Sequence, residues 1–251
     1  MNTIFCFSGT GNSLYAANKI AETLAAEVCN MREPVECSSD VIGFVFPTYF
    51  WGLPKTVSRF LEKMRITNKG AYIFSVTTYG GFSYGVSGAV NKLLGKQGVK
   101  LSYSGKVKMV ENYIPGFNSN DSDMLWEKSD KQIERIIKDV TDRRHNTPEI
   151  YTVFNNAAQK FYPANKGSCA ANFTVDGCKA CGLCGKICPN GNITFIDGIP
   201  KFGESCELCM GCLNVCPADA INYGAATGGK KRYKNRKVSA NELIDLHCPK
   251  K

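Results

Sequence analysis

Two kinds of apolar pattern alternate along the first half of the chain. Continuous apolar runs stand at residues 3–8 (TIFCFS), 41–47 (VIGFVFP) and 71–81 (AYIFSVTTYGG), and a further strand is predicted around residues 106–113 (KVKMVENY). Such runs, ending at turn residues, are typical of the buried strands of a parallel sheet. The pattern therefore predicts a sheet that is covered on both faces.

Between these runs the apolar residues recur at helical spacing, which predicts amphipathic helices. The first helix is expected to begin near Asn12, and a long fourth helix is expected to end before Pro148. The defining apolar residues are Leu14, Ala17, Ile20, Ala21 and Leu24; Val57, Phe60, Leu61 and Met64; Val86, Val90, Leu93 and Leu94; and Trp126, Ile133, Ile137 and Val140. This order of strands and helices predicts an α/β domain over residues 1–150, built on a doubly wound five-stranded parallel sheet.

The periodicity fades after residue 150, and the chain becomes rich in cysteine. We expect a linker with some helix over residues 151–174, a cysteine-rich domain over 175–226 and a basic tail with a short helix over 227–251. The cysteine-rich part contains a repeat displaced by 28 residues, in which Pro189 corresponds to Pro217 and Ile193 to Ile221. The repeat predicts two similar units packed about a pseudo-twofold axis.

Eight of the thirteen cysteines fall within the repeat, between Cys178 and Cys216. An odd total in a chain of 251 residues argues against a disulfide scaffold and favours metal ligation in a reducing cytosol. Zinc sites normally use two well-separated ligand pairs, whereas here three cysteines lie within seven residues and a fourth precedes a proline. The spacing fits a cubane of iron and sulfur better than a single ion. Zinc, or clusters that only staple the fold, are the alternatives.

The spacing C-x2-C-x2-C-x3-C-P, present twice, resembles that of bacterial two-cluster ferredoxins, small α+β domains in which the fourth cysteine of each run ligates the other cluster. The resemblance implies two [4Fe-4S] clusters. It assigns to the first cluster Cys178, Cys181, Cys184 and Cys216, and to the second cluster Cys206, Cys209, Cys212 and Cys188.

The loop FSGTGNS joins the first predicted strand to the first predicted helix. Backbone N–H groups at such a position form a ready anion site. The loop is neither the dinucleotide fingerprint G-x-G-x-x-G nor a P-loop. A helix cap with small residues for packing is the alternative interpretation.

The same loop resembles the [ST]-x-T-G-x-[ST] run that holds the FMN phosphate in flavodoxins, and two later loops resemble their flavin-ring loops. The flavodoxin-like fold and an FMN cofactor are what this resemblance implies. The implied binding residues are Ser8, Gly9, Thr10, Gly11, Asn12 and Ser13 in the phosphate loop; Pro47, Thr48, Tyr49, Phe50, Trp51 and Gly52 in the second loop; and Thr78, Tyr79, Gly80 and Gly81 in the third. The aromatic residues could instead pack on a neighbouring domain. Residues 112–121 (NYIPGFNSND) are expected to form an ordinary loop, and the alternative is that they close over the site or face the clusters.

Together the two motif sets resemble clostridial-type fusions of a flavodoxin with a two-cluster ferredoxin. The resemblance implies electron transfer between two [4Fe-4S] clusters and FMN, with redox proteins as partners. The alternative is a flavin-dependent reductase of a quinone or another small acceptor, so it stays open whether the protein is an enzyme. No catalytic residue is assigned, and His145 and His247 are placed in surface or tail segments.

The net charge of +9 comes partly from residues 230–237 (KKRYKNRK). We interpret this run as a solvated tail, with a docking patch for an acidic redox protein as the second interpretation and nucleic acid as the third. No signal peptide or membrane span is expected, which predicts a cytoplasmic protein. Neither nucleic acid nor membrane is expected as a partner, and a homodimer remains open.

Overall fold

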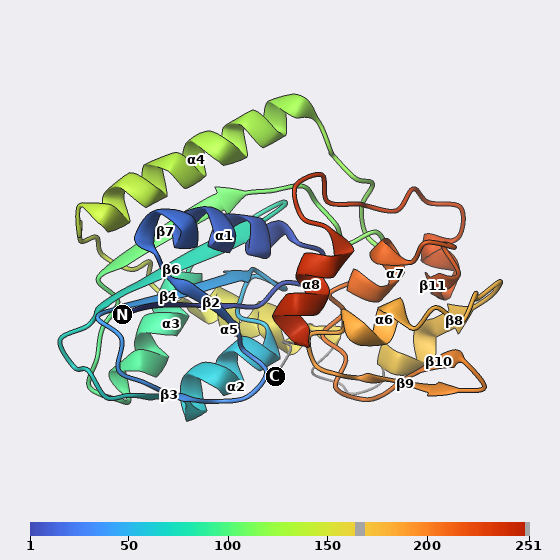
Figure 1. Ribbon diagram of the computed structural model, residues 1–251, viewed down its shortest axis with the longest axis horizontal. Coiled ribbons are helices and arrows are strands. Elements are labelled where there is room, and N and C mark those ends of the chain that lie inside the picture. Colours follow the sequence, from blue (N-terminus) through green and yellow to red (C-terminus); the bar gives the residue numbers. More distant parts are fainter. Residues whose placement is uncertain (164–168, 249–251) are drawn as a thin grey trace.

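A five-stranded parallel sheet forms the centre of the molecule in a computed structural model that describes residues 1–163 and 169–248 (Figure 1). The strands run in the order β2-β1-β4-β6-β7. They are β2 (Glu27–Asn30), β1 (Asn2–Cys6), β4 (Val41–Pro47), β6 (Tyr72–Tyr79) and β7 (Tyr103–Lys108). This is the flavodoxin-like order of doubly wound sheets, so the predicted α/β class is confirmed for this half of the chain.

Helices cover both faces of the sheet, as predicted. On one face lie α1 (Asn12–Leu24) and α4 (Asp123–Thr141), and on the other lie α2 (Lys55–Lys63) and α3 (Val86–Gly95) (Figure 1). Each face has its own apolar cluster, and the side chains of Ile4, Phe44 and Phe74 are fully buried between the layers. A short parallel pair, β3 (Glu36–Cys37) and β5 (Arg65–Ile66), lies apart from this sheet.

Two strands differ from the sequence predictions. The edge strand β2 was not located in the sequence. Its side chains, in the sequence EVCN, remain partly exposed, so they form no continuous apolar run. Strand β7 spans Tyr103–Lys108, so the strand predicted around residues 106–113 begins and ends too late in the sequence. Alternating buried and half-exposed residues in β7 carry a weaker signal than the continuous runs of β4 and β6.

The cysteine repeat forms a small lobe, residues 169–227, beside the carboxyl ends of the sheet (Figure 1). Two antiparallel pairs frame it: β8 (Phe173–Val175) with β11 (Ile221–Tyr223), and β9 (Ile193–Ile196) with β10 (Ile199–Phe202). Its short helices are α6 (Leu183–Lys186) and α7 (Gly211–Val215), with 3-10 turns at Cys169–Asn172 and Gly224–Thr227. The predicted linker contains α5 (Val153–Lys160), and its residues 164–168 lie outside the described part of the chain.

Residues 230–247 pack between the lobe and the sheet, so the interpretation of residues 230–237 as a solvated tail holds only for the exposed side chains of Lys231, Lys234, Arg236 and Lys237. Arg232 and Tyr233 are buried. The Arg232 guanidinium donates to the carbonyl groups of Ile221 and Thr227, and Lys230 Nζ donates to that of Ile114. Basic side chains carry only donors, which suits them to irregular backbone with free carbonyl groups. The final helix, α8 (Ala240–His247), buries Leu243 and Leu246 in the apolar cluster of α1 and α4.

None of the helices in the described ranges, residues 1–163 and 169–248, has the length and apolar character needed to cross a membrane.

Candidate functional site

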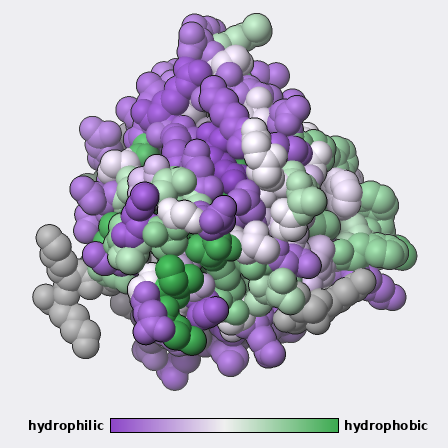
Figure 2. All heavy atoms as spheres, turned by 90° about the vertical axis from the view of Figure 1, so that its right-hand side faces the viewer, coloured by the Kyte–Doolittle hydropathy of each residue, from purple (hydrophilic) through white to green (hydrophobic). Residues whose placement is uncertain are grey.

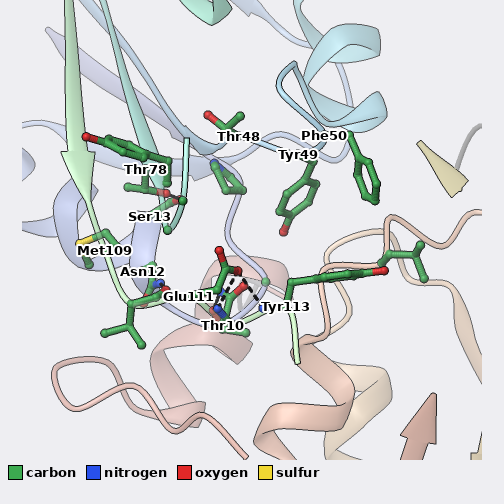
Figure 3. Close-up of a pocket in the computed structure, with 18 of the residues that line it drawn as sticks. Thr10, Asn12, Ser13, Thr48, Tyr49, Phe50, Thr78, Met109, Glu111 and Tyr113 are labelled. Atoms are coloured by element: carbon green, nitrogen blue, oxygen red, sulfur yellow. Dashed lines mark hydrogen bonds between the residues drawn. The ribbon is translucent and has the colours of Figure 1, made fainter. Parts of the chain in front are cut away.

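A cavity of about 400 Å3 opens at the carboxyl ends of strands β1, β4, β6 and β7. Doubly wound sheets place their ligands at this edge. Figure 3 shows side chains from the loops after all four strands converging on the cavity. Of the residues predicted for the flavin site, the cavity is lined by Ser8, Gly9, Thr10, Asn12, Ser13, Pro47, Thr48, Tyr49, Phe50, Trp51, Thr78, Tyr79, Gly80 and Gly81.

The loop that precedes helix α1 presents buried hydroxyl groups to this cavity. Ser8, Thr10 and Ser13 are each at most 3% exposed, and Ser13 Oγ lies 2.7 Å from Thr78 Oγ1 on the third loop. Ser8 Oγ accepts from the backbone N–H groups of Gly11 and Leu14, which orders the first turn of α1. Hydroxyl groups at a helix N-terminus can hold a phosphate without a cationic side chain.

Two predicted glycines, Gly11 and Gly52, do not line the cavity. Gly11 has a φ of 99° and packs against Val238 and Asn235 of the C-terminal segment. A Cβ at Gly52 would lie 2.4 Å from Nε2 of Gln159, on helix α5. Both glycines therefore let other parts of the chain pack closely against the predicted binding loops, on the side away from the cavity.

The second loop is a strained two-residue turn. Tyr49 and Gly52 exchange backbone hydrogen bonds of 3.1 and 3.0 Å, while Phe50 and Trp51 between them have φ values of 45° and 57°. Residues other than glycine rarely adopt this left-handed conformation, which costs about 1–2 kcal/mol per residue. The turn therefore needs support from its surroundings.

Helix α5 supplies that support through two inward-facing amides. Gln159 Nε2 donates to the carbonyl groups of Tyr49 and Phe50 at 2.7 and 2.9 Å. Asn155 Nδ2 donates to the Trp51 carbonyl at 2.9 Å, and Asn155 is fully buried. Three consecutive carbonyl groups of the turn are thus fixed by the predicted linker.

Aromatic rings line the side of the cavity that faces the cysteine lobe. Phe50 stacks on Tyr162 with ring centroids 4.9 Å apart, and Tyr49 meets Tyr162 edge to face. Both loop residues also pack on an apolar cluster that contains Leu208 and Met210 of the lobe. Tyr49 and Phe50 therefore line the cavity and also pack on the lobe.

Several residues of the cavity lie outside the sequence predictions. They are Phe82, Met109, Val110, Glu111, Asn112, Tyr113, Phe117, Tyr162, Glu207 and Leu208. Glu111 to Phe117 belong to the segment after β7, so part of the loop expected at residues 112–121 lines the cavity. Strand position was the available signal, because this segment also follows the carboxyl end of a strand. Tyr162, Glu207 and Leu208 come from outside the sheet domain and carried no such signal.

The eight predicted cluster cysteines line two cavities in the crossed arrangement. The inner cavity, next to the sheet domain, is lined by Cys188, Cys206, Cys209 and Cys212. The outer cavity is lined by Cys178, Cys181, Cys184 and Cys216, and Cys181 is exposed. We call residues 206–223 the inner repeat and residues 178–195 the outer repeat.

Backbone N–H groups point at the sulfur atoms in both cavities. Cys178 Sγ accepts from Ala180 at 3.4 Å, and Cys206 Sγ accepts from Leu208 at 3.4 Å. Burial raises the pKa of Cys206 to about 12 and that of Cys184 to about 11. Neutral thiols would gain little from such donors, whereas thiolates bound to a cation would be stabilised by them.

Within residues 1–163 and 169–248, no group of three or more His, Cys, Asp and Glu side chains is arranged to hold a metal ion.

The phosphate loop touches the inner repeat directly. A Cβ added to Gly9 would lie 2.6 Å from Cys209 Cβ and 3.1 Å from Cys209 Sγ, and a Cβ on Gly211 would lie 2.4 Å from the Gly9 carbonyl oxygen. Only glycines permit this approach. One wall therefore separates the cavity of the sheet domain from the inner cysteine cavity.

Glu207 of the inner repeat also anchors the lobe to helix α2. The residue is 4% exposed, and its carboxyl group accepts from the backbone N–H groups of Lys55 and Thr56 at 3.1 and 2.5 Å. Tyr162 Oη donates to the same carboxyl group at 2.8 Å. Because α2 follows Pro54 and has no side-chain cap of its own, Glu207 acts as its N-terminal cap.

The C-terminal segment holds the phosphate loop from the opposite side. Asn12 Oδ1 accepts from Tyr233 Oη at 2.7 Å and from Asn235 Nδ2 at 3.0 Å. His247 Nε2 donates to the Ser8 carbonyl at 2.8 Å. His247 lies in the segment predicted as a tail but is 2% exposed, whereas His145 is exposed. Burial, opposed by the Ser8 hydrogen bond, lowers the pKa of His247 to about 4.

Comparisons with known proteins describe only the sheet half of the chain. No protein-family model matches the sequence, and no curated protein matches it. Among solved structures, the chain is similar to a flavodoxin from Megasphaera elsdenii, with 20% identity and a TM-score of 0.35 over 43% of this chain and 85% of that one. A flavodoxin from Streptococcus pneumonia TIGR4 has 14% identity and a TM-score of 0.36, over 55% and 97%. The Trp repressor binding protein from Bacillus subtilis has 9% identity and a TM-score of 0.40, over 55% and 98%.

Proposed function

We propose that this protein transfers single electrons between an FMN in the 400 Å3 cavity and two [4Fe-4S] clusters in the cysteine lobe. Ser8, Thr10 and Ser13, with the N-terminus of α1, would hold the phosphate. The ring would lie between the strained turn at residues 49–52 and the third loop at residues 78–81. FMN supplies chemistry that couples one-electron and two-electron transfer.

The clusters would be ligated in the crossed arrangement of the two cysteine cavities. Cys188, Cys206, Cys209 and Cys212 would hold the inner cluster, and Cys178, Cys181, Cys184 and Cys216 the outer one. The crossed ligands, Cys188 and Cys216, tie each repeat to the other. Backbone N–H groups directed at the sulfurs would stabilise the negative charge of the thiolates.

The contact between Gly9 and Cys209 is the observation that carries this proposal. It brings the proposed phosphate loop and a proposed cluster ligand into van der Waals contact, and the two residues together form the wall between the cavities. Tyr49, Phe50 and Leu208 belong to one apolar cluster beside this wall. An electron would thus cross from one cofactor to the other through packed protein, without diffusion of either lobe.

The outer cavity suits the exchange of electrons with a partner protein. Cys181 is exposed there, whereas Cys209 in the inner cavity is covered by the phosphate loop. A route from partner to outer cluster, inner cluster and flavin, or the reverse, follows from this order. We propose no catalytic side chain for a separate substrate.

Anaerobic purification with iron, sulfide and flavin measured on one sample tests this function. We expect about eight iron atoms, eight sulfides and one FMN per chain. Rapid reduction of the flavin by pre-reduced clusters, lost in Cys209→Ser but with FMN still bound, would support the internal route. Iron without flavin after reconstitution, or flavin that is reduced only by NAD(P)H and reoxidised by quinones, would contradict it and favour a carrier with an empty cavity or a reductase.

A further inference from the structure

Helix α5 has its polar and apolar faces inverted. The amides of Asn155 and Gln159 point inward to the strained turn, as described above. The outward face carries Val153, Phe154, Ala157 and Phe161, all of which are exposed. At 100° per residue these four side chains fall within an arc of about 100°, so they form one continuous apolar stripe. A surface helix normally turns such a stripe toward the core.

The stripe continues into neighbouring loops and forms a larger apolar surface. Trp51 meets Phe154 with ring centroids 6.0 Å apart, and Asn155 ties the Tyr84 carbonyl to the same helix. The α5 surface, as we name this area, comprises Ile150, Val153, Phe154, Phe161, Trp51, Phe82 and Tyr84, with exposed fractions from 39% to 84%. Trp51 and Phe82 also line the flavin cavity, so the surface reaches the mouth of that cavity.

We propose that a second copy of this chain covers the α5 surface and forms a twofold dimer. The seven side chains offer on the order of 800 Å2, which matches one partner's share of a standard interface and exceeds the usual largest patch of a monomer. With a twofold axis, the α5 surface of one chain would contact the α5 surface of the other. The stripe itself has no charged side chain that this contact would bury.

The composition of the surface distinguishes this occupant from others. Dimer interfaces are apolar at their centre and poor in charged residues, whereas transient redox contacts are smaller and depend on charge complementarity. The α5 surface contains three phenylalanines, a tryptophan and a tyrosine, and the exposed Lys160 of α5 lies at its edge. Its partner therefore stays bound, and the dimer also encloses the strained turn at residues 49–52 on its solvent side.

This inference does not depend on the proposed electron transfer, because α5 lies outside the cysteine lobe. Figure 2 shows the end of the molecule formed by that lobe, where apolar atoms also gather in the lower half. The hairpin of β9 and β10 there exposes Ile196 to the same extent as Phe154, 59%. Ile196 thus provides a matched control for a substitution on α5.

Sedimentation velocity of the cofactor-loaded protein at about 0.5 to 50 µM tests the dimer. We expect twice the chain mass for the wild type and for Ile196→Asp, and a single-chain mass for Phe154→Asp, with at least a 100-fold weaker dissociation constant. Acrylamide quenching of Trp51 should rise only in Phe154→Asp. Iron and flavin contents of the same samples separate loss of the dimer from loss of the cofactors. Should Phe154→Asp not fold, the more exposed Val153→Glu takes its place.

Three results would overturn the inference. They are a wild-type monomer at the highest concentration, a Phe154→Asp or Val153→Glu variant that remains dimeric, and an Ile196→Asp variant that dissociates to the same degree. Flotation of the wild type with vesicles of anionic and neutral phospholipids identifies a membrane as the occupant if a monomer binds them, and this outcome also overturns the dimer.

Discussion

The inner repeat packs against the phosphate loop and helix α2, whereas the outer repeat faces solvent over much of its surface. At equivalent positions, Glu207 is buried and caps α2 while Lys179 is exposed. Asn214 is fully buried and donates to the Asn112 carbonyl, while its equivalent Lys186 is exposed. One cysteine spacing thus serves two environments: the inner repeat is buried between its cysteines, whereas the outer repeat contacts the sheet domain mainly after them, through Arg32 and Thr56.

The largest expected effect is on the lobe as a whole. Removal of iron by anaerobic chelation should unfold residues 178–216, because the lobe has few large apolar side chains to replace the bonds to metal. We expect hydrogen exchange there to accelerate more than about 100-fold, while exchange in β1 and β4 changes less than about 10-fold. Retained protection in both repeats would show that the lobe is stabilised by its own packing. Retained protection in the inner repeat alone would show that contacts with the sheet domain stabilise that repeat.

The contact at Gly9 is the next test. Gly9→Ala places a methyl group 2.6 Å from Cys209 Cβ, and such overpacking should lower the free energy of unfolding by about 3 kcal/mol and weaken flavin binding. Gly95→Ala, at the end of α3, is the control because its added Cβ meets nothing within 4 Å. Chemical denaturation and flavin fluorescence measure both variants. Equal stability of the two would mean that the wall between the cavities can relax.

Glu207 and Lys179 provide a smaller, matched pair. Glu207→Gln replaces an acceptor oxygen that faces backbone N–H groups of α2, and it should cost about 1–2 kcal/mol. Lys179→Gln should stay within about 0.5 kcal/mol, since its side chain is exposed. Thermal unfolding of both variants measures the difference. A penalty at Lys179 as large as that at Glu207 would contradict the asymmetry of the repeats.

The smallest expected effect depends on pH through His247. Its pKa of about 4 in the folded protein lies below the usual 6.5, so the unfolded chain binds more protons between these values and stability falls as pH is lowered. From pH 7.5 to 5.5 the loss should be on the order of 1 kcal/mol. Denaturation across this range should lose that component in His247→Asn and retain it in His145→Gln. An unchanged slope in His247→Asn would assign the effect elsewhere.

Much of the sheet domain could be predicted from the sequence because buried strands and amphipathic helices leave periodic apolar patterns. The cysteine positions were equally readable, since ligand spacing is local. The approach of Gly9 to Cys209 left no such signal, because it joins residues 200 positions apart. The segment from Lys230 to Lys237 was misread for a related reason: its donors satisfy distant carbonyl groups, a use that composition alone does not distinguish from solvation.

The clasp of Tyr233, Asn235 and His247 on the phosphate loop has a consequence for biosynthesis. Residues 8–13 leave the ribosome early, but the groups that hold them from behind are translated more than 200 residues later. At about 5–20 residues per second this delay lasts roughly 10–45 s. During that interval the nascent loop lacks the hydrogen bonds of this segment, so cofactor loading is expected to follow the synthesis of residues 233–247.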